Sequence, residues 1–301
     1  MTLSPTHTAV ASPAGSPETE ASRAATPRHY LMCPPTYFDV VYAINPWMDP
    51  TSGVDTARAV AQWEELKATY EAHGHQVEVV DPVADLPDMV YAANGGAVVG
   101  GRALAARFVH AERRAEGPAY EAWFSGPGAV VGLKSLGQAV ELNEGQGDFL
   151  LAGDVLLAGT GFRTTLAAHA EAARLLDVEV VTLELVDPRY YHLDTALAVL
   201  DDGAVSGERT LAWYPPAFSS RSQEVVRDLF PDAIVASDED AAVLGLNAVS
   251  DGRHVFLTDR ATGLHERLRE RGFEPVGIDL SELLKGGGSV KCCTLELDLP
   301  R

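Results

Sequence analysis

Short apolar runs alternate with amphipathic stretches along the chain from His29 onward. One arrangement recurs: an apolar run, a turn rich in Gly or Asp, a second apolar run and often a helix-forming stretch after it. Such hairpins are predicted at residues 90–107, 148–162, 195–206 and 243–258, with turns near residues 95–96, 153–154, 201–203 and 251–252. This mixture of strand-like and helix-like periodicity predicts an α/β fold.

Helices are predicted at residues 55–72, 164–176, 219–230 and 261–271, because each amphipathic stretch has Ser, Thr or Asp near its start. A fifth unit would be closed by pairing residues 292–297 with a first strand expected at residues 38–43. The spacing of roughly 50 residues indicates a repeated hairpin-plus-helix module. An ordinary α/β sandwich with antiparallel hairpins would produce a similar pattern without repetition.

The composition narrows the class of protein. Apolar residues make up 46% and charged residues 22% of the 301 positions, as is typical of a globular protein. No apolar run approaches the roughly 18 residues of a membrane span, so none is expected. The 23 Lys and Arg residues against 43 Asp and Glu give a formal charge of -20, which disfavours nucleic acid and anionic membranes and favours small or cationic partners.

Residues 1–27 are rich in Ser, Thr, Ala and Pro and lack the apolar core of a signal peptide. They are predicted to be a disordered leader before one folded domain, residues 28–301. Three cysteines cannot form a disulfide framework, and no set of Cys and His has zinc-ligand spacing. The sequence therefore predicts a cytoplasmic protein in a reducing compartment, without a metal site. A homo-oligomer is compatible with these features.

Near the C-terminus, the three glycines at positions 286–288 precede Cys292 by a few residues. Glycine lets the backbone approach a ligand closely, and a thiol placed just after the glycines could face that ligand. Cys292 is therefore the candidate nucleophile, provided that positive charge or a cationic substrate lowers its pKa. The alternative interpretation is that Cys292 and Cys293 are small buried residues of the last strand.

A histidine and a carboxylate lie two positions apart at the start of the third hairpin, as His192 and Asp194. If the segment is a strand, both side chains point to the same face. The histidine could then protonate a leaving amine and activate water, while the aspartate binds a cationic group. A structural role for both residues, with the histidine satisfied in a turn and the aspartate capping the backbone, is equally compatible with the sequence.

Polar residues stand beside the other turns as well. The second hairpin is entered through two acids among glycines, where Glu144 could hold a guanidinium or orient His192, and Asp148 could satisfy a turn. Asn94 precedes two glycines and Asn45 precedes a proline, and each is also an ordinary turn residue. Their recurrence at the ends of hairpins favours a shared function, because a ring of modules would bring those ends to one centre.

Together, residues 88–94, 144–148, 192–195 and 286–292 resemble the guanidine-modifying enzymes, the superfamily of arginine deiminases, dimethylargininases, arginine dihydrolases and amidinotransferases. The resemblance extends over residues 30–297 and keeps the family's motif order. It implies a five-bladed pseudo-symmetric α/β propeller, the pentein fold, and an enzyme that needs no metal or organic cofactor. By this resemblance Cys292 is the nucleophile, His192 the general acid and base, and Glu144 the carboxylate that assists the histidine and the substrate.

The same resemblance assigns substrate-binding positions. Arg113 and Arg163 correspond to arginines that bind the substrate α-carboxylate, a pairing that suits an amino acid. Asp88 matches a carboxylate of the dimethylargininase substrate loop, and Asp194 matches the guanidinium-binding aspartate of arginine deiminases. Asp148 is a further candidate, although the motif after Glu144 is one residue longer than the common form.

Two asparagines distinguish the branches of the family. Asn94 stands where deiminases and many dimethylargininases have an aspartate, and together with Asn45 it resembles the arginine dihydrolase branch, in which both asparagines belong to the substrate site. The resemblance therefore favours an arginine dihydrolase over a dimethylargininase.

The activity implied is hydrolysis of the guanidino C–N bond of free arginine or Nω-methylated arginine through a covalent thiouronium. The products would be citrulline, or ornithine after a second hydrolysis, with ammonia or methylamines. An amidinotransferase would use the same residues with an amine in place of water. A non-catalytic arginine-binding protein would not need the cysteine and the histidine, and a metal-dependent ureohydrolase needs clustered Asp and His ligands that the sequence lacks.

Overall fold

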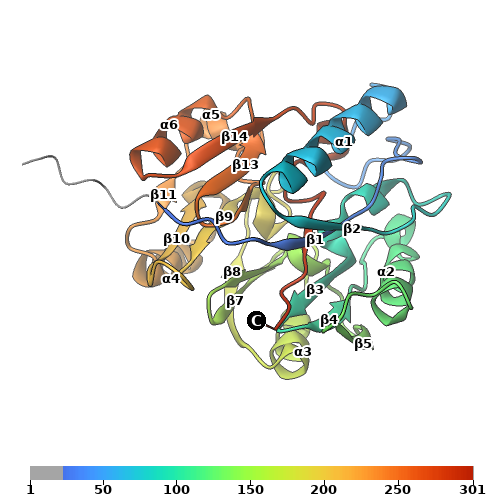
Figure 1. Cartoon of the computed structure of the whole chain (residues 1–301), viewed down its shortest axis with the longest axis horizontal. Helices are drawn as coiled ribbons and strands as arrows, with labels where there is room; N and C mark the ends of the chain where they lie inside the picture. Colours follow the sequence, from blue (N-terminus) through green and yellow to red (C-terminus); the bar gives the residue numbers. More distant parts are fainter. Residues whose placement is uncertain (1–22, 301) are drawn as a thin grey trace, which may run out of the picture.

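The computed structural model describes residues 23–300, and residues 1–22 and 301 lie outside the described part of the chain. Within residues 23–300, fifteen strands form five sheets of three strands each (Figure 1). In every sheet the middle strand pairs antiparallel with one neighbour and parallel with the other. This pairing confirms the predicted α/β class and is consistent with five copies of one module.

The five sheets follow one another along the chain, and each has its middle strand in second place. They are β15 (Leu295–Glu296), β1 (His29–Met32) and β2 (Gln76–Val79); β3 (Gly96–Val99), β4 (Arg102–Ala105) and β5 (Lys134–Gln138); β6 (Phe149–Ala152), β7 (Val155–Thr160) and β8 (Glu179–Glu184); β9 (Leu197–Asp202), β10 (Arg209–Trp213) and β11 (Ile234–Val235); and β12 (Val249–Ser250), β13 (His254–Thr258) and β14 (Glu274–Ile278).

A parallel pair needs a crossover, because the chain must return to the same end of the sheet. In each module a helix supplies this crossover, and Figure 1 shows the helices following one another around the outside of the molecule. The crossover helices are α1 (Thr56–Ala72), α2 (Glu116–Ser125), α3 (Leu166–Leu176), α4 (Ser220–Leu229) and α6 (Thr262–Glu270), and the short helix α5 (Asp238–Ala241) follows β11.

The four predicted helices are confirmed as α1, α3, α4 and α6. Asp55, Thr165 and Ser219 precede the first three, and each side chain accepts a hydrogen bond from a backbone N–H three residues later. The sequence does not predict α2, because Gly117 and Pro118 in its first turn are typical of loops. Proline is tolerated at this position, since N–H groups of the first turn have no partner within the helix.

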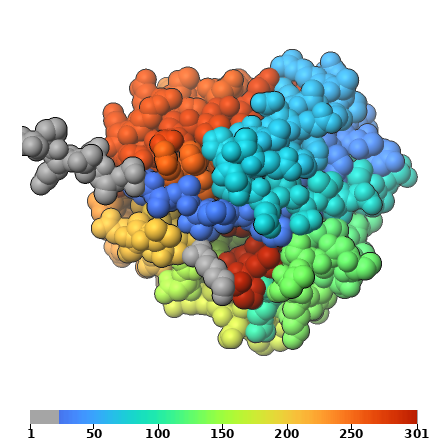
Figure 2. Space-filling model, viewed as in Figure 1, coloured from blue at the N-terminus to red at the C-terminus, as the bar shows by residue number. Residues whose placement is uncertain are grey.

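The first strand predicted at residues 38–43 is wrong. The structure has no strand there, and the module is closed instead by β15 pairing with β1, through Tyr30 opposite Glu296 and Leu31 opposite Leu295. Phe38 packs edge-on against the ring of a tyrosine, with centroids 5.9 Å apart, so its apolar character reflects burial of a loop. Figure 2 shows the C-terminal segment in red beside the N-terminal segment in blue, as this closure requires.

The hairpin turns at residues 153–154 and 251–252 are confirmed, whereas the first and third hairpins differ from the prediction. The first turn lies at Gly100 and Gly101, which have φ of 54° and 77°, and residues 95–96 instead lead into β3. The third hairpin is longer than expected, since β10 begins only at Arg209.

Each antiparallel partner of a middle strand is preceded by a tight turn. We call these partners, β3, β6, β9, β12 and β15, the entry strands. Three of the turns are the 3-10 helices Ala92–Gly95, Gly145–Gly147 and Leu193–Thr195. The other two are hydrogen-bonded turns at residues 244–248 and 289–294. The fold therefore presents five equivalent turns, one at the start of each entry strand.

Hydrogen bonds join the fifth turn to the first and the fourth. The backbone N–H of Ala93 donates to the carbonyl oxygen of Cys292 at 3.0 Å. The side chain of Asn247 accepts a hydrogen bond from the Cys292 backbone N–H at 3.0 Å and donates to the carbonyl oxygen of Asp194 at 3.1 Å, which also joins the fourth turn to the third.

The second turn is in contact with both the third and the first turn. The backbone N–H of Leu193 donates to Asp148 Oδ1 at 3.0 Å and so joins the third turn to the second. Gly145 has a φ of 53° and lies directly on the backbone of Gly96, where a Cβ atom would collide with the carbonyl oxygen. The five turns are therefore in contact in a closed series, each with the next.

The predicted leader, residues 1–27, falls mostly outside the described residues. Its last five residues are described and contact the folded chain. The guanidinium of Arg23 lies 3.7 Å from the ring centroid of Phe273, and the backbone N–H of Thr26 donates to the carbonyl oxygen of Asp251 at 2.8 Å. None of the helices in residues 23–300 has the length and apolar character required to cross a bilayer.

Candidate active site

One polar side chain from each turn, or from the residue before it, is buried at the start of an entry strand. All five are at most 2% exposed. Burying polar groups costs free energy unless they find partners, so five of them in adjacent turns indicate a constraint other than packing. The five residues are Asn94, Glu144, His192, Asn247 and Cys292.

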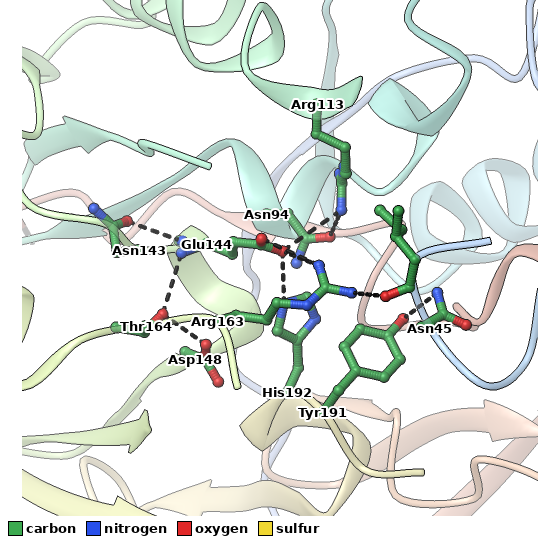
Figure 3. Close-up of polar contacts among 12 residues, drawn as sticks. Asn45, Asn94, Arg113, Asn143, Glu144, Asp148, Arg163, Thr164, Tyr191 and His192 are labelled. Atoms are coloured by element: carbon green, nitrogen blue, oxygen red, sulfur yellow. Dashed lines mark hydrogen bonds and ion pairs between the residues drawn. The ribbon is translucent and has the colours of Figure 1, made fainter. Parts of the chain in front are cut away.

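Glu144 is the centre of the polar contacts in this cluster (Figure 3). Its Oε2 lies 2.8 Å from Nε2 of His192, and Nη1 of Arg163 donates to both of its oxygens, at 3.1 and 2.9 Å. Nη1 of Arg113 lies 3.8 Å away. Burial opposes ionisation, but these two arginines and the histidine together hold the pKa of Glu144 well below its ordinary value. The carboxylate is therefore ionised at neutral pH.

The prediction that His192 and Asp194 lie on one face of a strand is wrong. Residues Leu193–Thr195 form a 3-10 helix, so the two side chains leave the backbone in different directions. His192 contacts Glu144, whereas Asp194 Oδ2 lies 3.4 Å from the sulfur of Cys292. The tight turn still brings both residues into the cluster, next to different members of it.

Arg113 is fixed by protein groups. Its Nε and Nη2 donate to the two oxygens of Glu116 at 2.9 and 2.7 Å, and its Nη1 donates to Oδ1 of Asn94 at 2.9 Å. Nη2 also donates to the carbonyl oxygen of Asp88 at 3.2 Å. This arrangement fixes the orientation of the Asn94 amide, because its oxygen faces the guanidinium and its nitrogen must point the other way.

Arg163 has protein partners too. Besides its contacts with Glu144, its Nη2 donates to the carbonyl oxygen of Ile44 at 2.8 Å, and its guanidinium lies 4.7 Å from the ring centroid of Tyr191 (Figure 3). The sequence predicted Arg113 and Arg163 as a clamp for a substrate carboxylate. The structure places both in the site but pairs both with buried glutamates, because buried anions require a cationic partner.

The sulfur of Cys292 lies between a carboxylate and an amide. It donates to Oδ2 of Asp194 at 3.4 Å and accepts a hydrogen bond from Nδ2 of Asn247 at 3.1 Å. Burial, the charge of Asp194 and the neighbouring Cys293 raise the pKa of the thiol well above its ordinary value. Burial likewise raises the pKa of Asp194 to about 7. Cys292 is therefore a neutral thiol in this arrangement.

The glycines before Cys292 serve the packing of aromatic side chains. A Cβ atom at Gly286 or Gly288 would collide with Tyr91, whose hydroxyl group donates to the carbonyl oxygen of Leu283 at 2.7 Å. Gly287 has a φ of 88°, in the left-handed region that favours glycine. The interpretation that these glycines leave room for a ligand is therefore wrong for Gly286 and Gly288, where the Tyr91 ring fills the space, and beside Gly287 lie the Asn45 amide and the Tyr191 hydroxyl group.

Four buried polar atoms of the site have no hydrogen-bond partner among residues 23–300. Such atoms cost about 1–3 kcal/mol each, so they indicate a polar ligand or water. A Cβ atom at Gly147 would collide with the Asn94 amide and lie 3.2 Å from the His192 ring, so this glycine keeps the space between them open. The four atoms are Oδ1 of Asp88, Nδ2 of Asn94, Nδ1 of His192 and Oδ1 of Asp194.

Two further predicted residues support the site. Asn45 donates to the Tyr191 hydroxyl oxygen at 3.3 Å and to the Gly286 carbonyl oxygen at 3.1 Å, so it ties its own loop to the glycine run. Asp148 accepts from the Thr164 hydroxyl group at 2.6 Å and from the Leu193 backbone N–H at 3.0 Å. Both oxygens of Asp148 therefore have protein partners, which join it to the turn that follows His192.

The sequence reasoning missed Asn247, which is fully buried and contacts the sulfur of Cys292. A signal was present. Asn247 stands two positions before β12, as Asn94 stands two positions before β3, so the two asparagines occupy equivalent places in their modules. Aligning the modules by the starts of their entry strands would have found it.

The chain is similar in sequence and structure to proteins with known names. No protein-family model matches the chain. The chain is 56% identical over 283 residues to N(G),N(G)-dimethylarginine dimethylaminohydrolase of Mycobacterium tuberculosis, covering 94% of this chain and 89% of that protein. It is 40% identical over 275 residues to the bifunctional arginine dihydrolase/ornithine cyclodeaminase ArgZ of Synechocystis, covering 90% of this chain but 38% of that longer relative.

Solved structures agree with these relatives. The N-terminal domain of ArgZ, a cyanobacterial arginine dihydrolase crystallised as a cysteine-to-serine mutant with its substrate, matches with a TM-score of 0.81 at 38% identity over 90% of this chain and 98% of that one. A dimethylarginine dimethylaminohydrolase adduct matches with a TM-score of 0.69 at 19% identity over 90% of this chain and 100% of that one, which shows a common fold. The chain therefore belongs to the guanidine-modifying enzyme superfamily, whose members include the dimethylargininases and the arginine dihydrolases, and it has their pentein-type α/β fold.

Proposed function

We propose that this protein hydrolyses the guanidino C–N bond of free arginine through a covalent intermediate on Cys292. The observation that carries the proposal is the position of the cysteine next to Asp194, in a buried site where two carboxylate oxygens have no partner among the described residues. Relatives named as dimethylarginine and arginine hydrolases support the same reaction class.

A guanidinium ion suits the free positions of the site. It is planar, carries one positive charge and donates several N–H groups, whereas Oδ1 of Asp88 and Oδ1 of Asp194 are acceptors without partners within residues 23–300. Burial raises the pKa of both carboxyl groups. A bound cation lowers these pKa values again, because it stabilises the ionised forms.

Substrate binding also prepares the nucleophile. The thiol of Cys292 is neutral next to Asp194, and a cation bound against that carboxylate offsets the repulsion that a thiolate would meet. The thiolate then forms a C–S bond to the guanidinium carbon while the C=N electron pair moves onto nitrogen. The proton released from sulfur is taken up by the neutral imidazole of His192, which thereby becomes the acid of the next step.

His192 carries the proton transfers. In its protonated form, stabilised by Glu144 at 2.8 Å, it donates a proton to the departing nitrogen as the C–N bond breaks and ammonia leaves. The neutral imidazole then takes a proton from water, which attacks the thiouronium carbon. The C–S bond breaks, the thiolate is restored, and arginine plus water has become citrulline plus ammonia.

Asn94 favours a second hydrolysis. Its Nδ2 is a donor without a partner among the described residues, and it can bind the ureido oxygen of citrulline. An aspartate there would present only acceptors and repel that oxygen. Citrulline plus water then gives ornithine, carbon dioxide and ammonia, so the protein acts as an arginine dihydrolase.

The carboxylate end of the substrate is assigned to Arg113 and Arg163. The guanidinium of Arg163 lies on Glu144, the same carboxylate that a substrate guanidinium would approach. We propose that the substrate replaces Arg163 there and that the displaced guanidinium turns to the α-carboxylate. Arg113 keeps Glu116 as its partner and contributes positive charge.

A second candidate is hydrolysis of Nω-methylated arginine to citrulline and methylamines. The observation that favours it is the 56% identity to the mycobacterial dimethylarginine dimethylaminohydrolase. The chemistry is the same, and the two substrates differ only in methyl groups on the leaving nitrogen, for which hydrophobic contacts discriminate weakly.

We also propose an architecture for the chain and a location in the cell. Identical strand pairing in five sheets and the closed series of turns support a five-bladed propeller with the site at its centre, in one catalytic domain from residue 28 onward. The free cysteines Cys33, Cys292 and Cys293, all buried, support a reducing cytoplasmic location.

Purified protein incubated with arginine, monomethylarginine, asymmetric dimethylarginine and citrulline should convert arginine, and citrulline more slowly, to ornithine. Amino-acid and amine analysis identifies the products. Cys292→Ser should abolish turnover, because an alcohol is not ionised at this site, while the equally buried Cys293→Ser serves as the matched control and should keep it. An active Cys292→Ser variant would remove the proposed nucleophile.

Asn94→Asp tests the second hydrolysis. The aspartate keeps the size of the side chain and the acceptor for Arg113, but it loses the donor for the ureido oxygen. The ratio of ornithine to citrulline should fall at least about tenfold, the worth of roughly one hydrogen bond to a reacting group. An unchanged product ratio measured by chromatography would show that Asn94 does not select the branch.

Arg163→Lys tests the clamp for the carboxylate. Agmatine has the guanidinium of arginine without its carboxylate, so the ratio of kcat/KM for arginine to that for agmatine isolates the carboxylate contact. We expect this ratio to fall roughly tenfold or more in the variant, because a lysine lacks the bidentate fork. If the variant lost only its contact with Glu144, kcat/KM would fall equally for arginine and agmatine, and their ratio would stay unchanged.

Alkylation tests the electrostatics of the thiol. Neutral 2-chloroacetamide and cationic 2-chloroacetamidine have nearly the same shape, and the cation should modify Cys292 faster. At pH 8, above the pKa of about 7 to which burial raises Asp194, Asp194→Asn should speed the neutral reagent and slow the cationic one. Mass spectrometry of the modified peptide measures both alkylation rates. If Asp194→Asn raised both rates or lowered both, the mechanism would be contradicted.

A further inference from the structure

The side chain of Asn247 uses all four of its hydrogen-bonding positions. Its Oδ1 accepts from the backbone N–H groups of Ser289 at 3.1 Å and Cys292 at 3.0 Å. Its Nδ2 donates to the carbonyl oxygen of Asp194 at 3.1 Å and to the sulfur of Cys292 at 3.1 Å. Only a carboxamide supplies two donors and two acceptors at this reach, so the position is specific for asparagine.

The orientation of this amide is fixed by its partners. Two backbone N–H groups can be met only by the oxygen, so the nitrogen must face the carbonyl oxygen of Asp194 and the sulfur. The residue is fully buried, and water cannot replace these contacts. The N–H group aimed at the sulfur is therefore present before any substrate binds.

We infer that Asn247 is a further catalytic residue, which holds the sulfur of Cys292 in place and stabilises its negative charge through a hydrogen bond from Nδ2. The inference rests on the proposed function of Cys292 as nucleophile. A donor that touches the sulfur favours the thiolate over the thiol, because the bond strengthens as charge develops on the acceptor.

The surroundings of the sulfur make this donor important. The other polar side chain in contact with it is Asp194, whose carboxylate accepts the thiol proton and repels the thiolate, while the backbone of Ser289 adds a hydrogen bond that lowers the pKa of the thiol. Lys291 lies next in the chain, but its ammonium group donates to Oε1 of Gln146 and to the Thr294 carbonyl oxygen, both at 2.9 Å. Within the described residues, Asn247 is thus the side-chain donor in hydrogen-bond contact with the sulfur.

The same four hydrogen bonds also connect the segment proposed to bind the substrate with the segment that carries the nucleophile. Asn247 ties the turn of Asp194, which is proposed to bind the guanidinium, to the turn that carries the nucleophile. Attack on the substrate carbon requires the sulfur at a fixed place relative to that guanidinium. One side chain therefore controls both the position of the sulfur and its charge.

The test uses Asn247→Ala and the isosteric Asn247→Asp, which keeps the shape but replaces the two donors by acceptors. The rate of alkylation of Cys292 by neutral 2-chloroacetamide is measured from pH 6 to pH 10, and steady-state kinetics with arginine are measured beside it. We expect alkylation below the thiol pKa and kcat each to fall roughly 10- to 100-fold, the worth of a hydrogen bond to a charged atom. KM should change less than about threefold, since fully buried Asn247 contacts the nucleophile and not the substrate.

Asn143→Ala is the matched control. Asn143 is 2% exposed and also holds a turn before an entry strand, donating to the Glu141 carbonyl oxygen at 3.2 Å and accepting from the Gly145 N–H at 3.1 Å, without contacting the sulfur. Its loss should lower the melting temperature but leave the pH profile of alkylation in place.

The outcomes separate the possible failures. If folded Asn247→Asp alkylates with the wild-type rate and pH profile, the inference is overturned. Should Asn247→Ala not fold, Asn247→Asp and Asn247→Ser provide the same readout. Alkylation needs no turnover, so a wild-type protein that reacts with 2-chloroacetamide at Cys292 but hydrolyses no guanidine would overturn the proposed function while leaving the hydrogen bond to the sulfur measurable.

Discussion

The structure of the site depends on the compensation of buried charge around Glu144. A carboxylate that is 0% exposed is stable only with cationic partners, and Arg163, Arg113 and His192 supply them from three separate segments of the chain. The two arginines are fixed in turn by further protein groups, Arg163 by the Ile44 carbonyl oxygen and Arg113 by Glu116. The contacts of one buried anion therefore specify the relative position of the module of β6, the module of β9 and the loop before α2.

The fold provides these contacts by repetition. A tight turn before each entry strand exposes backbone and side-chain groups at one end of the strand, and the five turns contact one another in series. Each module then contributes one buried polar residue, and the chemistry arises from their differences: an amide, a carboxylate, an imidazole, a second amide and a thiol. The same module can thus be kept for stability while individual positions serve the reaction.

The sequence predicts those features that depend on local interactions. Capped helices such as α1 and hairpins with Gly-Asp turns follow from neighbouring residues, and the resemblance of the motifs locates Cys292, His192 and Glu144 in one site. Features that depend on distant residues are missed: the glycine run packs on Tyr91, nearly 200 positions earlier in the chain, and residues 38–43 form a loop although they alternate like a strand. Asn247 could be predicted from the repetition of the modules, because it stands two positions before β12, as Asn94 stands two positions before β3.

The balance of charge explains why a cationic substrate completes this site. Around the site, Asp88, Glu116, Glu144, Asp148 and Asp194 are buried carboxyl groups, against the buried cations Arg113, Arg163 and Lys291 and, in its protonated form, His192. Burial acts against ionisation of all five, and the pKa of each lies above its ordinary value except that of Glu144, whose cationic neighbours outweigh burial, so without a further cation some of the others hold protons. In the proposed mechanism a guanidinium supplies the missing positive charge, and it does so next to Asp194, the carboxylate that suppresses the thiolate. In the proposed mechanism, binding of a cation and activation of the nucleophile are therefore one electrostatic event, and neutral citrulline, which favours the thiolate less, reacts more slowly than arginine.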